Sequence, residues 1–246
     1  MKKAMIILLT AFLLTGCVGQ NKTIEENQPN QEVTDLVNDP KQEMTDDHAK
    51  EDNKESVSIE DVGYTVRVDE TERPFAYYGI ILKNNNVEIA KEPVIVLSFK
   101  DDKGKVYMEQ EQSLSYIYPG DRVVYSGIVD CGETIPTDIQ FSCKFSETGK
   151  SEEMNAIKSS DLKIIDVKEE STNNITRFTG NIQNLSKQDI PMAVVTVLIK
   201  NKSKIVMGTN TFVMELNQGD SLSFELQEQD LPEHDEVIIS ALPFVI

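Results

Sequence analysis

The chain from residue 58 onwards is a series of short apolar runs separated by turn-forming residues. β-Branched and aromatic residues dominate the runs, and no stretch keeps the 3.6-residue period of an amphipathic helix, so the pattern predicts an all-β fold. The first six runs are expected to be strands at 64–68, 77–84, 93–100, 105–112, 121–129 and 138–145. Six more follow in the same order, at 161–168, 176–184, 191–200, 203–210, 220–227 and 236–244.

The second group of runs repeats the first after about 100 residues. Four pairs of positions show this, three separated by 99 residues and the last by 101: Gly120 and Gly219, Lys105 and Lys204, Phe145 and Phe244, and Gly79 and Gly180. Each copy holds enough strands to bury a core of its own. The repeat therefore predicts two β-sandwich domains, at 59–148 and 159–246.

Turn-forming residues in both copies fit antiparallel sheets. The segments 101–105 and 201–204 each lie between two runs, where Gly or Asn is expected to supply the positive φ of a hairpin turn. Pro93 and Pro191 stand at strand starts, where a missing N–H group does least harm. These positions support strands joined by short hairpins.

The first 16 residues are an apolar segment preceded by two lysines. The segment from Ala4 to Leu14 is shorter than the roughly 20 residues that a membrane-spanning helix needs, so it predicts a secretory signal. It ends in Leu-Thr-Gly-Cys (14–17), which resembles the lipobox of bacterial lipoproteins. The resemblance implies that residues 1–16 are removed and that Cys17 carries a diacylglyceryl anchor. The alternative is a signal-peptide cysteine without a role.

A lipid on Cys17 would place the exported protein on the outer face of the cytoplasmic membrane, at the cell surface. Residues 17–58 then form a linker, and residues 18–57 contain eleven acidic residues and no aromatic one, which predicts disorder. The linker is either a tether that lifts the domains off the membrane or a solvated tail.

The chain is strongly acidic. Its formal net charge is −18, and removal of residues 1–16 makes it −20, since they contain two lysines and no acid. Such a charge repels nucleic acid phosphates and anionic lipid headgroups. Nucleic acid is therefore not an expected partner, and membrane contact is expected only through the lipid.

The second copy resembles the FxLYD-type immunoglobulin-like domain of bacterial surface lipoproteins. It carries FTGNIQN (178–184), a long apolar run, a polar hairpin and QGD (218–220), in the order in which those domains carry them. The first copy shows the pattern as YYGIILKN (77–84) and PGD (119–121), and LSFKD and VLIKN replace the Leu-Tyr-Asp triplet in the two copies. The resemblance implies two tandem immunoglobulin-like β-sandwiches and says little about function.

No catalytic, metal or cofactor site is expected. His48 lies in the linker and His234 in a loop, and neither is held by packed neighbours as a catalytic base would be. The cysteines and histidines do not have zinc-ligand spacing, and no acidic segment matches the twelve-residue calcium loop. We expect a protein that is not an enzyme, with no small-molecule substrate.

Two features occur only in the first copy. Cys131 and Cys143 either form a disulfide, which we favour because export permits oxidation, or are two small core residues. All seven tyrosines lie there too, and an interface would use them for rigid contact area, whereas core positions are the alternative. The residues considered for a partner surface are Tyr77, Tyr78, Tyr116 and Tyr118.

These observations predict a cell-envelope lipoprotein that presents two β-sandwich modules for binding to, or assembly with, other surface components. One alternative is a structural spacer or envelope-stress protein with no dedicated ligand, and another is an enzyme with an unrecognised site. A contiguous exposed tyrosine patch on the first domain would favour binding.

Overall fold

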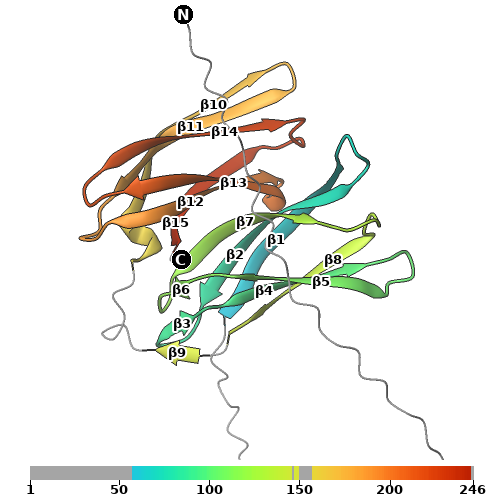
Figure 1. Ribbon diagram of the computed structural model, residues 1–246, viewed down its shortest axis with the longest axis horizontal. Coiled ribbons are helices and arrows are strands. Elements are labelled where there is room, and N and C mark those ends of the chain that lie inside the picture. The colour runs from blue at the N-terminus through green and yellow to red at the C-terminus, as the bar shows by residue number, and fades with distance from the viewer. Residues whose placement is uncertain (1–56, 146, 150–156, 245–246) are drawn as a thin grey trace, which may run out of the picture. The chain divides into compact units, whose positions relative to one another are not determined.

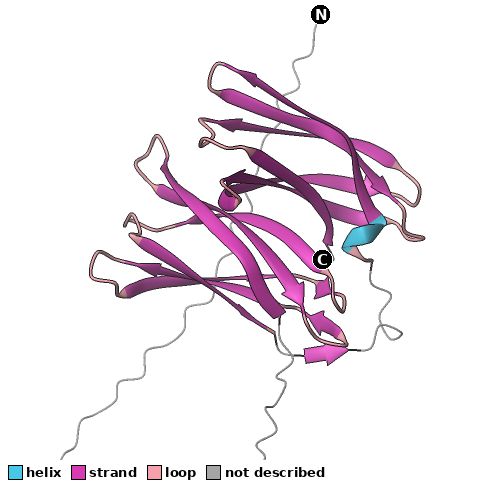
Figure 2. Ribbon diagram, turned by 180° about the vertical axis from the view of Figure 1, so that it is seen from behind, coloured by secondary structure: helices cyan, strands magenta, loops and turns pink. Residues whose placement is uncertain are grey.

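The computed structural model describes residues 57–145, 147–149 and 157–244, which belong to one compact unit, Glu51–Ile246 (Figures 1 and 2). Apart from the 3₁₀ turn η2 (Ser159–Asp161), the regular structure of these residues is strands, so the predicted all-β class is confirmed. None of their helical segments is long and apolar enough to cross a membrane. The expected signal peptide, Cys17 and the linker up to residue 56 lie outside the described residues.

The first copy folds into two three-stranded antiparallel sheets, with a smaller sheet at one end. The sheet of order β1-β2-β7 consists of β1 (Val57–Val68), β2 (Pro74–Asn84) and β7 (Arg122–Asp130). The sheet of order β5-β4-β8 consists of β4 (Val94–Lys100), β5 (Val106–Ser113) and β8 (Asp138–Lys144). The small sheet, which the sequence did not predict, consists of β3 (Ile89–Lys91), β6 (Tyr116–Ile117) and β9 (Glu147–Gly149).

The second copy has the same topology. Its strands are β10 (Leu162–Thr172), β11 (Ile175–Asn184), β12 (Ile190–Asn201), β13 (Lys204–Leu216), β14 (Ser221–Gln229) and β15 (Glu236–Phe244). The sheet β10-β11-β14 corresponds to β1-β2-β7, and β13-β12-β15 corresponds to β5-β4-β8. The sequence repeat is therefore a repeat of strand pairing, and each of the twelve predicted runs is a strand.

Each copy buries apolar side chains between its two sheets, which makes it a β-sandwich. Tyr78 and Phe99 are fully buried in the first core, and Phe178 is fully buried in the second. Residues two apart along β14 point into the core, as Phe224 and Leu226 do, because successive side chains of a strand face opposite sides.

A fully buried asparagine occupies the same place in both sandwiches. The side-chain amide of Asn84 donates to Glu88 O (2.9 Å) and Ile117 O (2.8 Å), and that of Asn184 donates to Gln188 O (2.8 Å) and Leu216 O (3.1 Å). A buried amide is tolerated when its donors and acceptor are satisfied. Each asparagine thus ties the following loop and the end of a more distant strand to the end of its own strand.

The separation between equivalent residues corrects one predicted correspondence. Asn84 and Asn184 share their contacts, so this strand repeats after 100 residues, and Gly79 corresponds to Thr179 rather than to Gly180. A shift of one residue matters because it moves a side chain to the other face of the sheet. A Cβ on Gly79 would face the second sandwich, whereas one on Gly180 would face Phe224 in its own core.

The hairpin between β12 and β13 departs from the predicted turn chemistry. Gly104 supplies a positive φ (75°) in the first copy, as expected, but Lys202 (50°) and Ser203 (65°) supply it in the second. Positive φ at both central residues is typical of a type I′ turn, where Asn-Gly is preferred. This hairpin is one residue shorter than its counterpart, so equivalent positions after it are separated by 99 residues.

The two sandwiches are stacked face to face within the compact unit. The outer face of β1-β2-β7 packs against the outer face of β13-β12-β15, which gives four layers of sheet (Figure 1). The outermost layers are β5-β4-β8 and β10-β11-β14. That 59–148 and 159–246 are two independent domains stays a prediction.

Candidate functional site

The contact between the outer faces of β1-β2-β7 and β13-β12-β15, called the inter-sandwich interface below, is the best-defined candidate site. Three glycines, Gly63, Gly79 and Gly208, lie where the sheets approach most closely. A Cβ on Gly63 would lie 1.7 Å from Ile205 O, and one on Gly208 would lie 2.4 Å from Tyr78 O. Because only glycine lacks a Cβ, these positions let the two backbones touch.

Apolar side chains surround this glycine contact. Ile81 on β2, Leu198 on β12 and Ile205 on β13 form a separate buried cluster, against which Val124 and Ile238 pack. Complete burial of such a side chain contributes about 1.5–3 kcal/mol. The cluster is therefore a substantial source of stability for the stacked arrangement.

Hydrogen bonds fix the register of β13 across the first sandwich. Thr65 Oγ1 on β1 donates to Val206 O (2.7 Å), and Ser126 Oγ on β7 donates to Thr209 O (2.8 Å). Asn210 Nδ2 donates back to Ser126 O at 2.9 Å. β13 therefore crosses from β1 to β7, with its backbone carbonyls satisfied by the first sandwich.

Two ion pairs join charged groups across the interface. The Arg67 guanidinium donates to Glu228 Oε2 (3.1 Å) and Asp230 O (3.0 Å), and it lies 5.0 Å from the ring centre of Tyr77. Lys200 Nζ forms a second ion pair, with Asp61 Oδ2, at 3.3 Å. Arg67 and Lys200 thus bind groups of the opposite sandwich and act as structural contacts.

The residues that correspond to these interface positions in the other copy are polar, and they lie on the outermost sheets. Gly79 and Ile81 on β2 correspond to Thr179 and Asn181 on β11, which face solvent. On the other pair of sheets, Gly208 corresponds to Glu109, whose carboxylate accepts a hydrogen bond from Ser98 Oγ (2.8 Å) on the outer face. At these equivalent positions, the residues are small or apolar on the two faces that dock and polar on the two that do not.

The sequence of β12 contains a signal for this interface. β12 is apolar on both faces, and its outward residues Val194, Thr196 and Leu198 are buried along with the inward ones. A continuous apolar strand is typical of a sheet covered on both sides. The equivalent strand β4 instead has Ser98 in the place of Leu198.

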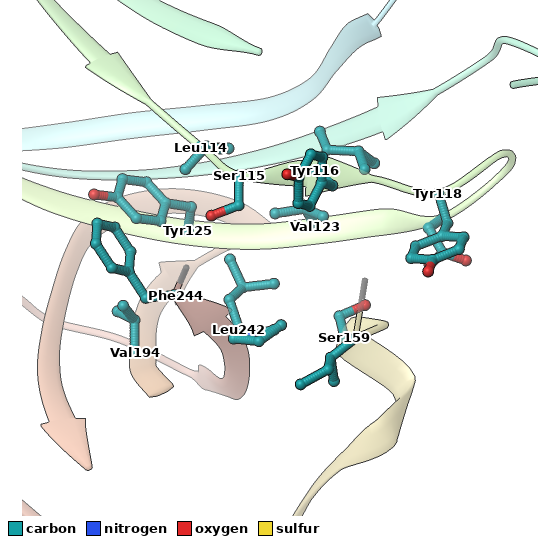
Figure 3. A pocket seen from close by; sticks show the side chains of 14 residues that line it. Leu114, Ser115, Tyr116, Tyr118, Val123, Tyr125, Ser159, Val194, Leu242 and Phe244 are labelled. Carbon is teal, nitrogen blue, oxygen red and sulfur yellow. The ribbon is translucent and has the colours of Figure 1, made fainter. Parts of the chain in front are cut away.

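The cavity at one end of the interface is too small for a ligand. Figure 3 shows it between the tyrosines of the first sandwich and the last strand of the second; its lining includes Tyr116, Tyr125, Val194, Leu242 and Phe244. Its volume is about 30 Å³, whereas small-molecule sites measure roughly 300–1,000 Å³. A water molecule or two would fill it.

The tyrosines do not form the exposed patch that would have favoured a partner surface. Tyr78 is fully buried, and burial raises its pKa well above the ordinary value, so its assignment to a surface was wrong. Tyr118 is also buried, and Tyr116 is half-buried beside the small cavity. Tyr77 is half-buried beneath Arg67 and packs against the second core. Alternation placed Tyr77 and Tyr78 on opposite faces, and both faces of this sheet are covered.

The favoured disulfide is not formed, because Cys131 and Cys143 are free thiols. Cys131 O accepts a hydrogen bond from the hydroxyl of Tyr107 on β5 (3.2 Å), whereas Cys143 lies on β8, at the opposite edge of the same sheet. Cys131 directly follows β7, a strand of the facing sheet β1-β2-β7, so the two cysteines come from different sheets of the first sandwich. Burial raises the pKa of each to about 11.

The remaining titratable candidate, His234, is paired with an acid. Its Nε2 lies 3.2 Å from Glu169 Oε1, and its Nδ1 lies 2.9 Å from Pro232 O. Partial burial lowers its pKa, but these two contacts and the charge of Asp235 outweigh that effect and raise it. Among the described residues, no group of three or more His, Cys, Asp and Glu side chains could hold a metal ion.

Comparisons with known proteins add no assignment. No protein-family model matches this chain, and no curated protein is similar to it in sequence.

Proposed function

We propose that this protein is a lipid-anchored cell-envelope protein that holds two stacked β-sandwiches at the surface for assembly with other envelope components, without catalysis. The main support for a lipid anchor is the sequence Leu-Thr-Gly-Cys at 14–17, at the end of a short apolar segment. The acidic residues that follow suit a tether, because their mutual repulsion extends a chain.

We also propose that each sandwich is of the immunoglobulin-like, FxLYD type. The support is the shared strand order of the two copies and the buried asparagine that ends β2 and β11. In both copies this asparagine precedes the long central strand, as in the family pattern. This assignment bears on fold, and fold alone does not identify a ligand.

Replacement of the anchor residue tests the proposed location. Cys17→Ser should abolish incorporation of labelled fatty acid and should release the chain from the membrane fraction or leave its leader uncleaved. Cys143→Ser is the matched control, since it removes a different thiol and should leave lipidation unchanged. If the Cys17→Ser chain loses its leader and still sediments with the membrane fraction, the proposed lipid anchor is refuted.

A structural spacer is the second candidate, and the polar outer faces favour it. The outer faces of β5-β4-β8 and β10-β11-β14 carry charged and amide side chains, such as Glu109 and Asn181, as a solvated surface does. Capture from intact envelopes with the lipid in place separates the two candidates. Recovery of a stoichiometric envelope protein supports assembly with other components, and its absence supports the spacer.

A further inference from the structure

The apolar outer face of β13 continues beyond the inter-sandwich interface into solvent. Gly208 and Asn210 contact the first sandwich, and the next two residues on that face are Phe212 and Met214. Their exposed fractions are 56% and 54%, which are large values for such side chains. The exposed surface is thus a direct extension of an established contact surface.

The repeat shows that this exposure is specific to the second copy. Positions 99 residues earlier in the first copy are Ser113 and Ser115, and the outer face of β5 otherwise carries Glu109 and Glu111. A polar outer face is therefore compatible with this strand. Exposed apolar residues that adjoin one another mark interaction sites more often than isolated ones do.

No described strand pairs with the outer edge of β13 at this place. β13 is an edge strand whose neighbour in the described sheet is β12 alone. Thr65 and Ser126 donate to its carbonyl groups at Val206 and Thr209, and the described residues show no side-chain hydrogen bond to its backbone from residue 211 to residue 215. Unpaired backbone groups on an edge strand are a template for pairing with another strand.

A third apolar residue adjoins this edge from the first sandwich. Val124, Ser126 and Ile128 point outward from β7; Val124 packs beside Leu198, and Ser126 contacts β13. Ile128 comes next in the same direction along β7 and is 48% exposed. It therefore lies on the free-edge side of β13.

We propose that β13 pairs antiparallel with β13 of a second copy, at residues 212–214, around a two-fold axis at Val213. In this register Phe212 of each chain lies opposite Met214 of the other, which forms two aromatic–thioether contacts. The positive φ of Glu215 (54°) ends the extended backbone directly after Met214, and residues 212–214 carry no charge, so no like charges face each other in the pairing. The strand is complementary to itself, as a two-fold contact between identical chains requires.

This pairing goes beyond the proposed function, because it needs neither the lipid nor another envelope component. The same surface could receive an apolar strand of a different protein, and the test separates that case from self-association.

Sedimentation of the chain from residue 17 to 246, carrying Cys17→Ser, tests the pairing. We expect a concentration-dependent dimer, and association at least tenfold weaker for F212S/M214S, which installs the residues of the first copy. Ile175→Ser is the control, since Ile175 is 45% exposed on the polar outer face of β11 and should leave the dimer intact. Circular dichroism checks that each variant remains folded.

Cysteine cross-linking tests the register. A mixture of F212C and M214C chains should form a disulfide-linked heterodimer, because directly opposite Cβ atoms lie about 4.5–5.5 Å apart, whereas diagonal ones lie about 7–8 Å apart. Each variant alone should cross-link much less. A parent chain that stays monomeric at its highest soluble concentration overturns the proposal, as does a dimer unaffected by F212S/M214S. Neither result bears on lipidation of Cys17.

Discussion

The substitution Gly208→Ala tests whether the two sandwiches touch through their backbones. A Cβ at this position would lie 2.4 Å from Tyr78 O and 2.6 Å from the Cα of Gly79, whereas ordinary contact begins at 3.4 Å. Both obstructing atoms belong to the backbone, so no side chain can rotate away. The sheets must therefore separate by on the order of 1 Å.

The cost follows from the side chains that this separation loosens. Complete burial of Ile81, Leu198 and Ile205 contributes about 5–9 kcal/mol in total. A gap of 0.5–1 Å forfeits roughly a quarter to a half of a packing contact. The predicted loss is about 1–4 kcal/mol, and we expect about 2–3 kcal/mol, within the usual range for overpacking.

Urea denaturation followed by circular dichroism measures this loss as a lower unfolding midpoint. A decrease in Tm of roughly 4–12 °C should accompany it, given the size of the folded unit. Glu109→Ala is the matched control, because Glu109 is the exposed equivalent of Gly208 and its truncation should change stability by less than about 0.5 kcal/mol. The backbone contact would be refuted by a Gly208→Ala protein as stable as the control.

Two further predictions concern the hairpin and the thiols. Lys202→Asn with Ser203→Gly should stabilise the protein by about 1 kcal/mol, since both positions have positive φ, and an unchanged urea midpoint would argue against this turn. Cys131 and Cys143 should resist a thiol reagent at pH 8 in the folded Cys17→Ser chain, because their pKa values are raised to about 11. After unfolding without a reductant, two thiols per chain should react. If no thiol reacts, the cysteines form a disulfide after all.

Local pattern was enough to predict the strands. The period-2 alternation that places Phe224 and Leu226 in the core requires only that one face be buried, and this information lies within a few residues. The buried Asn84 and Asn184 were visible as strand ends, but their loop contacts were not, because the partners lie up to 33 residues away.

Pairings between distant residues were not predictable in the same way. A shift of one residue in the alignment of the copies joined Gly79 to Gly180, although one faces outward and the other inward. Cys131 and Cys143 are close in sequence, yet Cys131 follows β7 in one sheet and Cys143 lies on β8 in the other. Sequence spacing gives neither the sheet edge nor the face.

The sequence by itself determined the all-β class, the repeat and the strands, because these depend on composition and short-range periodicity. Only the tertiary structure decided that the two sandwiches share an interface. The apolar outer face of β12, with Val194 and Leu198, shows that something covers this sheet, but it does not identify what. Which surface packs against this sheet depends on shape. Here the first sandwich can pack against it because glycine at 63, 79 and 208 lets the two backbones approach closely. The same long-range geometry leaves Phe212 uncovered.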